Sequence, residues 1–408
     1  MSYINLKYEP SKNDLITEFY VEPSRDIPFK KVAEQIAAES SIGTWTDVAT
    51  MKYRIKRLGA KVFEIDKNKV KIAYPIELFE EGNISQILSS IAGNIFGMNI
   101  IKNLKLQNII FPEKIVKSFK GPLFGIHGIR KLLKVYDRPL CGTIIKPKLG
   151  LNENEHARVA YEAWTGGIDI VKDDENLSSL SFNRFEKRLR KTFNAKEKAE
   201  KETGEKKIYM INITAEVKEM LRRARIVREV GNEYVMVDII TLGWSALQTL
   251  RNENDELKLV LHAHRAGHAI FTKGKHGISM LVIAKISRLI GVDQIHTGTA
   301  NIGKMESGEE ETKEINSFLK SEFFGLKSVF PVASGGLHPG SIPKLIELLG
   351  KDIIIQAGGG VHGHPNGTFS GAKAMRQAID AVVNGIPIED YMKNKKELKL
   401  AIKKWGLK

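Results

Sequence analysis

From about residue 138 onward, short apolar runs alternate with amphipathic helical segments, and the pattern occurs eight times. The runs lie at residues 142–150, 167–176, 207–215, 233–241, 257–266, 293–300, 329–336 and 352–360. They are nearly continuous in apolar residues, as strands of a buried parallel sheet are. Eight strand–helix units in roughly 250 residues predict a (β/α)8 barrel. The alternative, a doubly wound sheet, needs a nucleotide-binding fingerprint, and we find none in the right context.

Residues 1–120 follow a different pattern. Alternating, β-branched runs at 15–23 and 61–76 are interleaved with helical segments at 28–41 and 83–97. This predicts a smaller α+β domain with an antiparallel sheet. We therefore expect two domains, with an N-terminal domain at 1–120 and a catalytic barrel with a C-terminal helical tail at 121–408.

The net charge of +15 first suggests a nucleic-acid partner. The lysines, however, share segments such as 187–207 and 393–404 with acidic residues, a pattern typical of solvated helix faces. No apolar run approaches the ~18 residues needed to cross a membrane. The N-terminus has no signal pattern, and the single cysteine, Cys141, fits a reducing compartment. We expect a cytoplasmic protein that binds neither nucleic acid nor membrane.

The second run ends in Lys172, Asp173, Asp174 and Glu175. Strand side chains alternate between faces, so Lys172 and Asp174 share one face and Asp173 lies on the other. Charges on the inward face are costly to bury unless they are paired or bind a metal. Lys172, Asp174 and Glu175 could hold Mg²⁺, which prefers oxygen ligands, if CO₂ converts the lysine to a carbamate. A structural ion pair at a strand end is the other interpretation.

Further polar residues end other runs, where barrel active sites lie. Lys146 and Lys148 share a parity that points both into the barrel mouth, unless they simply form an exposed strand end. His264 with Arg265 lies near the end of the fifth run, and His296 ends the strand expected in the sixth. Single histidines are usually core residues, but two at adjacent strand ends facing a metal site favour a catalytic role.

The last three loops add an anion-binding pattern. Lys304 follows a glycine in the loop 298–311, which resembles a lid that delivers a charge, although a plain surface loop is the alternative. Ser334-Gly335-Gly336 and the glycines 358–360 end the last two runs, where backbone N–H groups often bind phosphate. The residues therefore predict a Mg²⁺-dependent barrel enzyme with a phosphorylated substrate, whose second phosphate the opposite lysines could hold.

Nine motifs resemble those of ribulose-1,5-bisphosphate carboxylase/oxygenase (rubisco) large subunits over nearly the whole chain. They are ESSIGTWTDV, GNIFG, GTIIKPKLGL, GGIDIVKDDEN, HAHRAGHA, IHTGT, GKME, PVASGGLH and QAGGGVHGHP. The shorter C-terminus is more similar to the archaeal (form III) type than to the plant type. The resemblance implies carboxylation of ribulose 1,5-bisphosphate with CO₂ and water to two 3-phosphoglycerates, an oxygenase side reaction with O₂, and a place in AMP salvage.

The resemblance also implies roles for individual residues. Lys172 would be the carbamylated lysine that takes the C3 proton, with Asp174 and Glu175 as the other Mg²⁺ ligands. Lys146 would protonate the final carbanion, His264 would assist proton transfer and hydration at C3, and Lys304 would stabilise the new carboxylate. Substrate would also be bound by Lys148, Arg265, His296, Ser334, Gly335, Gly336, Gly358 and Gly359. From a neighbouring subunit, the site would be completed by Glu39, Thr44, Trp45 and Asn94.

The last set implies a homodimer or a higher oligomer of dimers, and no small subunit is expected. The chain also departs from the plant pattern: Ile144 stands where threonine is usual, with Thr143 one position earlier, the lid has one extra residue, and Ser307 replaces a glycine. The alternative within the same fold is a rubisco-like enolase or isomerase acting on a sugar phosphate. Such proteins commonly lack several of the lysine and histidine residues that this chain retains.

Overall fold

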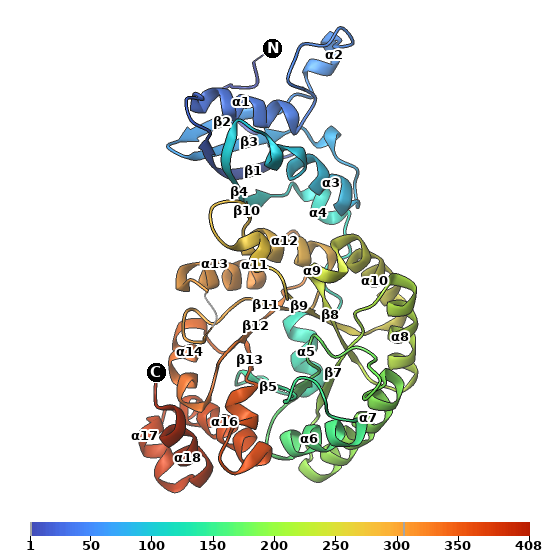
Figure 1. Ribbon diagram of the computed structural model, residues 1–408, viewed down its shortest axis with the longest axis vertical. Coiled ribbons are helices and arrows are strands. Elements are labelled where there is room, and N and C mark those ends of the chain that lie inside the picture. The colour runs from blue at the N-terminus through green and yellow to red at the C-terminus, as the bar shows by residue number, and fades with distance from the viewer. Residues whose placement is uncertain (1, 305–306) are drawn as a thin grey trace. The chain divides into compact units, whose positions relative to one another are not determined.

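The structure, a computed structural model, describes residues 2–304 and 307–408 (Figure 1). The chain forms two compact units. The first comprises Met1–Lys120, Gly267–Ile290 and Phe323–Leu326, and the second comprises Gly121–Ala266, Gly291–Glu322 and Lys327–Lys408. Within the described residues, no helix combines the length and the apolar character that a membrane span requires.

The first unit is built on a five-stranded sheet in the order β10-β4-β1-β3-β2. Its strands are β1 (Leu15–Pro23), β2 (Lys61–Asp66), β3 (Lys69–Tyr74), β4 (Ile101–Ile110) and β10 (Gly277–Ile278). The inward residues of β1 alternate with partly exposed ones, so one face of the sheet packs on a core. The pairs β1–β3, β1–β4 and β2–β3 are antiparallel, whereas β10 pairs with β4 in parallel. The expected α+β class is confirmed, while the sheet is mixed rather than purely antiparallel.

Short helices accompany this sheet. They are α1 (Phe29–Glu39), α2 (Tyr53–Lys56), α3 (Ile84–Ile91), α4 (Glu113–Lys117), α11 (Ala269–Thr272) and α12 (Met280–Ile290), with 3₁₀ turns η1 (Ile76–Leu78) and η2 (Asn94–Gly97). The Asn83 side chain caps α3 by accepting from the Gln86 backbone N–H. α12 follows barrel strand β9 in the chain, yet it belongs by its contacts to the first unit.

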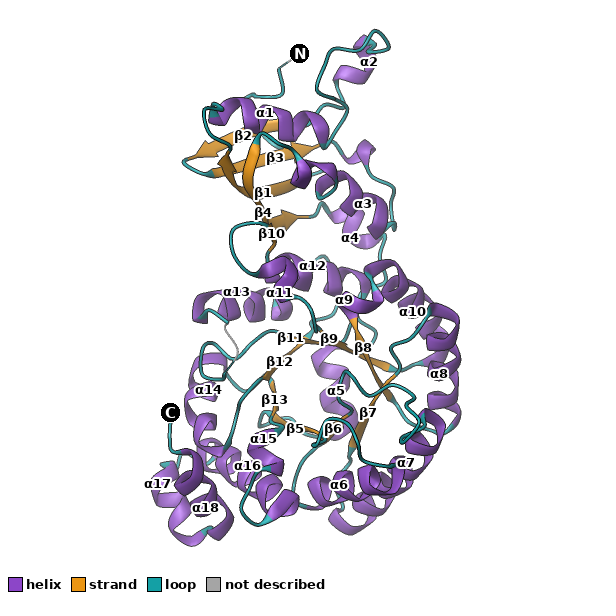
Figure 2. Ribbon diagram, in the orientation of Figure 1, coloured by secondary structure: helices purple, strands orange, loops and turns teal. Residues whose placement is uncertain are grey.

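The second unit contains a closed barrel of eight parallel strands, so the predicted (β/α)8 fold is confirmed (Figure 2). Around the barrel the order is β5-β6-β7-β8-β9-β11-β12-β13. The strands are β5 (Leu140–Ile144), β6 (Ile170–Lys172), β7 (Ile208–Asn212), β8 (Tyr234–Asp238), β9 (Val260–His264), β11 (Gln294–His296), β12 (Phe330–Ser334) and β13 (Ile354–Gln356). Seven predicted runs contain one strand each, and the first run overlaps β5, which begins two residues before it at Leu140. Every strand is shorter than its run.

Helices of the second unit surround the barrel in Figure 2. The longer ones are α6 (Glu153–Thr165), α7 (Phe185–Thr203), α8 (Val217–Glu229), α10 (Trp244–Leu257), α13 (Glu309–Lys320), α14 (Ile342–Leu349) and α16 (Gly367–Val383). Short elements are α9 (Ile239–Leu242), η3 (Pro339–Ser341) and α15 (Gly359–His362). The C-terminal α17 (Ile388–Tyr391), η4 (Met392–Asn394) and α18 (Lys396–Trp405) follow, and α18 packs on α16.

Helix α5 (Gly125–Leu133) closes the N-terminal end of the barrel. Its Ile129 and Leu133 belong to one buried cluster with residues near the starts of the strands, such as Leu140 and Ile170. The Asp293 carboxylate accepts hydrogen bonds from the backbone N–H groups of residues 124 and 125, at 2.6 and 2.9 Å. Because this end is plugged, the carboxyl ends of the strands are left for chemistry.

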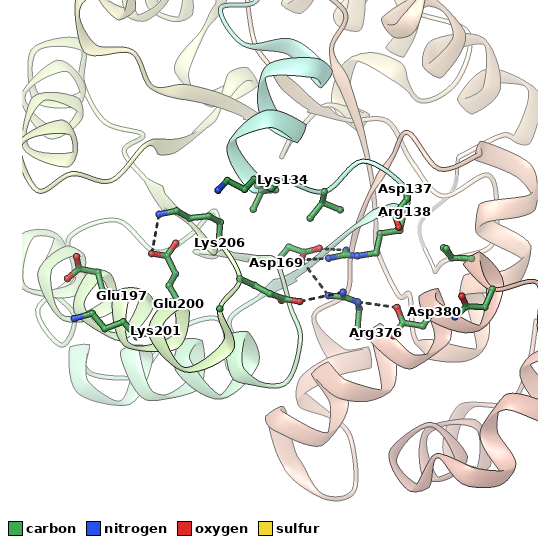
Figure 3. A pocket seen from close by; sticks show the side chains of 16 residues that line it. Lys134, Asp137, Arg138, Asp169, Glu197, Glu200, Lys201, Lys206, Arg376 and Asp380 are labelled. Atoms are coloured by element: carbon green, nitrogen blue, oxygen red, sulfur yellow. Dashed lines mark hydrogen bonds and ion pairs between the residues drawn. The ribbon is translucent and has the colours of Figure 1, made fainter.

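A charged cavity of about 690 Å³ is lined by charged residues (Figure 3). Three of them, Arg138, Asp169 and Lys206, come just before β5, β6 and β7, so the cavity lies at the strand starts and not at the predicted site. Within it, Arg138 donates to both oxygens of the buried Asp169, at 2.6 and 2.8 Å. Arg376 links Asp169, at 3.8 Å, to Asp380, at 3.2 Å. The central charges are thus paired with one another, which indicates a structural role.

Candidate active site

Lys172 is the last residue of β6, and its side chain is fully buried. Its ammonium donates to the Asp173 backbone carbonyl at 2.7 Å and lies 3.7 Å from Glu175 Oε2. Burial lowers the pKa of Lys172, and the surrounding carboxylates only partly oppose this effect. A lower pKa increases the fraction of neutral amine, which is the form that can react with CO₂.

Asp174 lies beside this lysine and is nearly inaccessible to solvent. It accepts from Lys146 Nζ at 2.8 Å and from Asn176 Nδ2 at 3.0 Å. Burial by itself would raise the pKa of Asp174, but these hydrogen bonds and the Lys146 charge lower it below its usual value. Asp174 is therefore ionised at neutral pH, as a metal ligand must be.

Asp173 points to the opposite side. Its carboxylate accepts from Arg188 Nε at 3.0 Å, from the Tyr209 hydroxyl at 2.9 Å and from the Asn212 backbone N–H at 3.1 Å, and every one of these partners is buried. Burial would raise the pKa of Asp173, but Arg188 and the hydrogen bonds hold it at about 2. The two neighbouring aspartates thus lie in different environments, as alternation predicts, although β6 itself ends at Lys172.

The donors present fit a hard cation only after one change. In the described ranges 2–304 and 307–408, no three His, Cys, Asp or Glu side chains group in a way that could hold a metal. Asp174 and Glu175 supply carboxylates, and Lys172 is the third group beside them. As an ammonium it repels a cation, whereas as a carbamate it offers oxygen. The arrangement therefore fits Mg²⁺ with a modified Lys172.

The two lysines that follow β5 differ. The strand ends at Ile144, so the prediction that strand alternation points both lysines inward is wrong in its premise. Lys146 is partly buried and reaches Asp174, whereas Lys148 is exposed. A Cβ atom added at Gly358, after β13, would lie 3.0 Å from Lys146 Cε. The missing side chain at Gly358 thus makes room for Lys146, and Gly359 begins the short helix α15.

His264 connects the metal-site candidates to the next strands. Its Nε2 lies 3.5 Å from Glu175 Oε2, and its Nδ1 lies 3.1 Å from Asp238 Oδ1. Asp238, the last residue of β8, was not among the predicted site residues. The signal was present, since this aspartate is a carboxylate within the fourth apolar run, after four apolar residues. The Asp238 carboxylate orients the His264 ring so that Nε2 faces Glu175.

His296 and Ser334 end β11 and β12, with His296 Nδ1 2.6 Å from Ser334 Oγ. Burial holds the pKa of His296 well below its usual value. The rings of His264 and His296 lie edge to face with centroids 4.9 Å apart. Arg265 follows His264 at the end of β9, and burial lowers its pKa to about 10. The structure therefore brings these predicted residues to the same end of the barrel.

The Gly335-Gly336 turn supports the segment that carries Lys304. The Lys304 backbone N–H donates to the Gly335 carbonyl at 2.9 Å. A Cβ atom on Gly336 would come within 2.8 Å of Lys304 backbone and side-chain atoms. The Lys304 side chain is exposed. Residues 305 and 306 of the predicted lid, part of its GKME motif, lie outside the described residues.

Ser307 ties the far end of the lid segment to its start. Its hydroxyl accepts from the Thr299 backbone N–H at 3.0 Å, and its own N–H donates to Asn301 Oδ1 at 3.3 Å. A glycine at position 307 would make the second contact but not the first. This departure from the plant pattern therefore adds a hydrogen bond across the base of the lid segment.

The four N-terminal site candidates lie in the first unit. Glu39 ends α1, Thr44 and Trp45 lie in the loop after it, and Asn94 begins η2. Trp45 is 84% exposed, which is unusual for a large aromatic side chain. An exposed tryptophan indicates a contact surface.

Comparison with known proteins identifies the family. The catalytic domain of the ribulose bisphosphate carboxylase large chain matches residues 125–405, and the N-terminal domain of the same chain matches residues 2–115. The chain belongs to the family of ribulose bisphosphate carboxylase large chains. A ribulose bisphosphate carboxylase from Pyrococcus abyssi is 52% identical over 411 residues, covering 100% of this chain and 96% of the relative. One from Methanocaldococcus jannaschii is 51% identical over 430 residues, covering 99% and 100%.

Solved rubisco structures agree with this assignment. The octameric rubisco from Pyrococcus horikoshii superimposes with a TM-score of 0.96 at 51% identity, covering 99% of this chain and 96% of that one. The dimeric archaeal rubisco from Hyperthermus butylicus gives 0.92 at 44% identity, covering 99% and 98%. The chain is thus an enzyme of the rubisco family with archaeal relatives, as its motifs predict.

Proposed function

We propose that this chain catalyses the Mg²⁺-dependent carboxylation of D-ribulose 1,5-bisphosphate to two 3-phosphoglycerates. The observation that carries the proposal is Lys172, a fully buried lysine of lowered pKa beside Asp174 and Glu175 at the carboxyl end of a barrel strand. Its neutral amine attacks CO₂, forming an N–C bond and releasing a proton to solvent. Lys172, Asp174 and Glu175 would then hold Mg²⁺, which when bound stabilises negative charge on the substrate oxygens.

The chain's own groups then move protons. The Lys172 carbamate takes the C3 proton to give an enediol, whose C2 bonds to CO₂. Water adds at C3 with help from His264, which Asp238 holds toward Glu175. Cleavage of the C2–C3 bond leaves a carbanion that Lys146 protonates, and its position 2.8 Å from Asp174 supports this role. O₂ competes with CO₂ for the enediol, which gives the oxygenase side reaction.

Other residues bind the substrate. Lys304 stabilises the carboxylate formed from CO₂, and Lys148 supports binding from the exposed turn after β5. One phosphate is held by Arg265, His296 and Ser334. The phosphate-binding region is lined by Gly335, Gly336, Gly358 and Gly359. The close approach of Gly336 to Lys304 supports a coupling between this turn and the lid.

The active unit is proposed to be a homodimer or a larger assembly of dimers without a small subunit. In it, Glu39, Thr44, Trp45 and Asn94 complete the neighbouring site, and the exposure of Trp45 supports this. We also propose functional domains at 1–120 and 121–408, consistent with the family matches at 2–115 and 125–405. From the resemblance to the archaeal type we also propose a role in AMP salvage, and the relatives from Pyrococcus abyssi and Methanocaldococcus jannaschii support only the archaeal type.

The test is an anaerobic assay with ribulose bisphosphate, Mg²⁺ and ¹⁴C-bicarbonate. We expect acid-stable label in 3-phosphoglycerate. Enolisation or isomerisation of the sugar phosphate without label incorporation would instead identify a rubisco-like protein and overturn the proposal.

Substituting alanine for Gly336 should lower kcat/KM about 10–100-fold, because the added methyl group would come within 2.8 Å of Lys304 and displace it. A displacement of about 1 Å of a group that contacts the substrate can lower the rate by about 100-fold. Gly350→Ala is the matched control, since Gly350 also has a positive φ, +76°, but nothing lies within 4 Å of its added Cβ. That variant should keep its kcat/KM and lose only stability. Equal kinetic effects in the two variants would show that backbone strain, not the lid contact, is responsible.

A further inference from the structure

Behind Ser334, a chain of hydrogen bonds runs into the barrel through three adjacent strands. Ser334 Oγ lies 2.6 Å from His296 Nδ1, His296 Nε2 lies 2.9 Å from His262 Nε2, and His262 Nδ1 lies 3.0 Å from Gln294 Oε1. His262 and Gln294 are fully buried, and the proposed reaction uses neither of them. We call these four side chains the barrel relay.

The barrel relay can hold its hydrogens in only two ways. Burial keeps the pKa of both His262 and His296 far below neutral, so each ring carries one N–H at neutral pH. One hydrogen lies between the two Nε2 atoms, and the ring to which it is covalently bound determines the tautomer of both rings. Every hydrogen bond in the relay therefore points inward, or every one points outward.

In the orientation of the structure, the hydrogen bonds point inward. Gln294 Oε1 can only accept, so His262 Nδ1 donates to it, His296 donates to His262, and Ser334 donates to His296. The Ser334 hydrogen is then committed to His296, and only lone pairs face the barrel mouth. Within the described part of the chain, Gln294 Nε2 has no hydrogen-bond partner, which is costly for a buried N–H.

Turning the Gln294 amide over reverses the whole chain. Its Nε2 then donates to His262, His262 donates to His296, and His296 donates to Ser334. This pairs one of the two Nε2 hydrogens and leaves an unpaired carbonyl in its place, which is the less costly orphan. The Ser334 hydroxyl is released to donate outward, which an anion at the barrel mouth requires.

We propose that Gln294 and His262 are positioning residues that set the barrel relay outward, so that Ser334 donates a hydrogen to the substrate phosphate. The inference rests on the proposed function in assigning a phosphate to Ser334. It makes His296 act on that phosphate through Ser334, because both ring nitrogens of His296 are used within the relay. It adds that a buried amide, three hydrogen bonds behind Ser334, controls the strength of the Ser334–phosphate contact. A phosphate ester oxyanion is the ligand class, because it accepts hydrogen bonds and offers none.

The test is a double-mutant cycle with Gln294→Met and Ser334→Ala. Methionine has a similar volume to glutamine and cannot hydrogen-bond as a donor. Calorimetry with ribulose bisphosphate, on enzyme freed of Mg²⁺ and CO₂, measures Kd where no carboxylation occurs. We expect Gln294→Met to weaken binding about tenfold, as befits a hydrogen bond to a charged group. In the Ser334→Ala background its effect should fall below about twofold.

The control is Gln356→Met, because Gln356 is a fully buried barrel glutamine outside the relay, with an unpartnered Oε1 among the described residues. It should bind the substrate within about twofold of wild type. If Gln294→Met does not fold, His262→Phe interrupts the next link and carries the same expectation. Under turnover, KM should rise while kcat stays within about twofold.

Two results would overturn the inference: unchanged Kd in Gln294→Met, or an equal loss with and without Ser334, which would indicate a purely structural effect. These results are separate from failure of the proposed function, which appears as missing ¹⁴C product in wild type. If wild type does not bind the bisphosphate, the same cycle is measured with inorganic phosphate, and the same two results decide it.

Discussion

Lys172→Met is expected to lower the carboxylation rate about 1,000-fold or more. Methionine preserves the volume in the buried β6 position but cannot form a carbamate. The proposed site then loses both its third oxygen ligand and the base that takes the C3 proton, each of which contributes several kcal/mol to catalysis. A loss of three decades corresponds to about 4 kcal/mol in the activation barrier.

The matched control is Lys207→Met. Lys207 is also a buried lysine, but it lies at the opposite end of the barrel, where it donates to the Ile168 carbonyl at 3.1 Å and to Glu205 at 2.7 Å. Its loss should reduce stability and leave the activity of the folded enzyme intact. The measurements are ¹⁴C incorporation and calorimetric Mg²⁺ binding in bicarbonate. Full activity, or unchanged Mg²⁺ affinity, in Lys172→Met would exclude the carbamate role.

Asp173→Asn should reduce the free energy of unfolding by about 3–5 kcal/mol, although it changes the neighbour of a proposed metal ligand. The change leaves the Arg188 guanidinium fully buried without its counter-charge, and breaking a buried pair in this way is strongly destabilising. Urea unfolding at pH 7, at one fixed protein concentration because oligomers gain stability by mass action, measures the loss.

The pH dependence gives a second measurement. The pKa of Asp173 is about 2 in the folded chain and about 3.9 when unfolded, so its ionised form stabilises the fold above about pH 4. This advantage over the asparagine variant should shrink as the pH falls from about 4 toward 2. Asp174→Asn is the comparison and should cost only about 1 kcal/mol, because Lys146 is partly exposed. Its larger effect should be lost Mg²⁺ binding. Equal destabilisation by both variants would contradict the separate roles.

The eight barrel strands could be predicted because each is a short apolar run, and burial of parallel strands demands that composition. The residues at which the strands end could not be predicted, because each apolar run continues into the following turn without a clear change in composition. Lys148 is the example: β5 ends at Ile144, and the turn that follows leaves this lysine exposed.

Contacts between residues on different strands could not be predicted from the sequence, for a different reason. Strand alternation places His262 on the same face as His264, but the hydrogen bonds of His262 to Gln294 and His296 depend on strand register around the barrel. Likewise, nothing in the two residues of β10 predicts that they pair with β4, more than 160 residues earlier. Periodicity describes single elements, whereas register is fixed only when the strands assemble.

The placement of β10 also affects how the protein is made. The edge of β4 is covered by the segment leading to β10, with Lys105 Nζ donating to the carbonyls of Thr272 and Gly274 at 2.6 and 2.8 Å. During translation this edge stays open until residue 278 leaves the ribosome, roughly 10–30 s after β4 at usual elongation rates. An open strand edge invites pairing with other chains. A gene fragment ending at residue 120 should therefore yield an aggregation-prone product, because it lacks β10. The first unit cannot be separated from the barrel by cutting the gene at a single point.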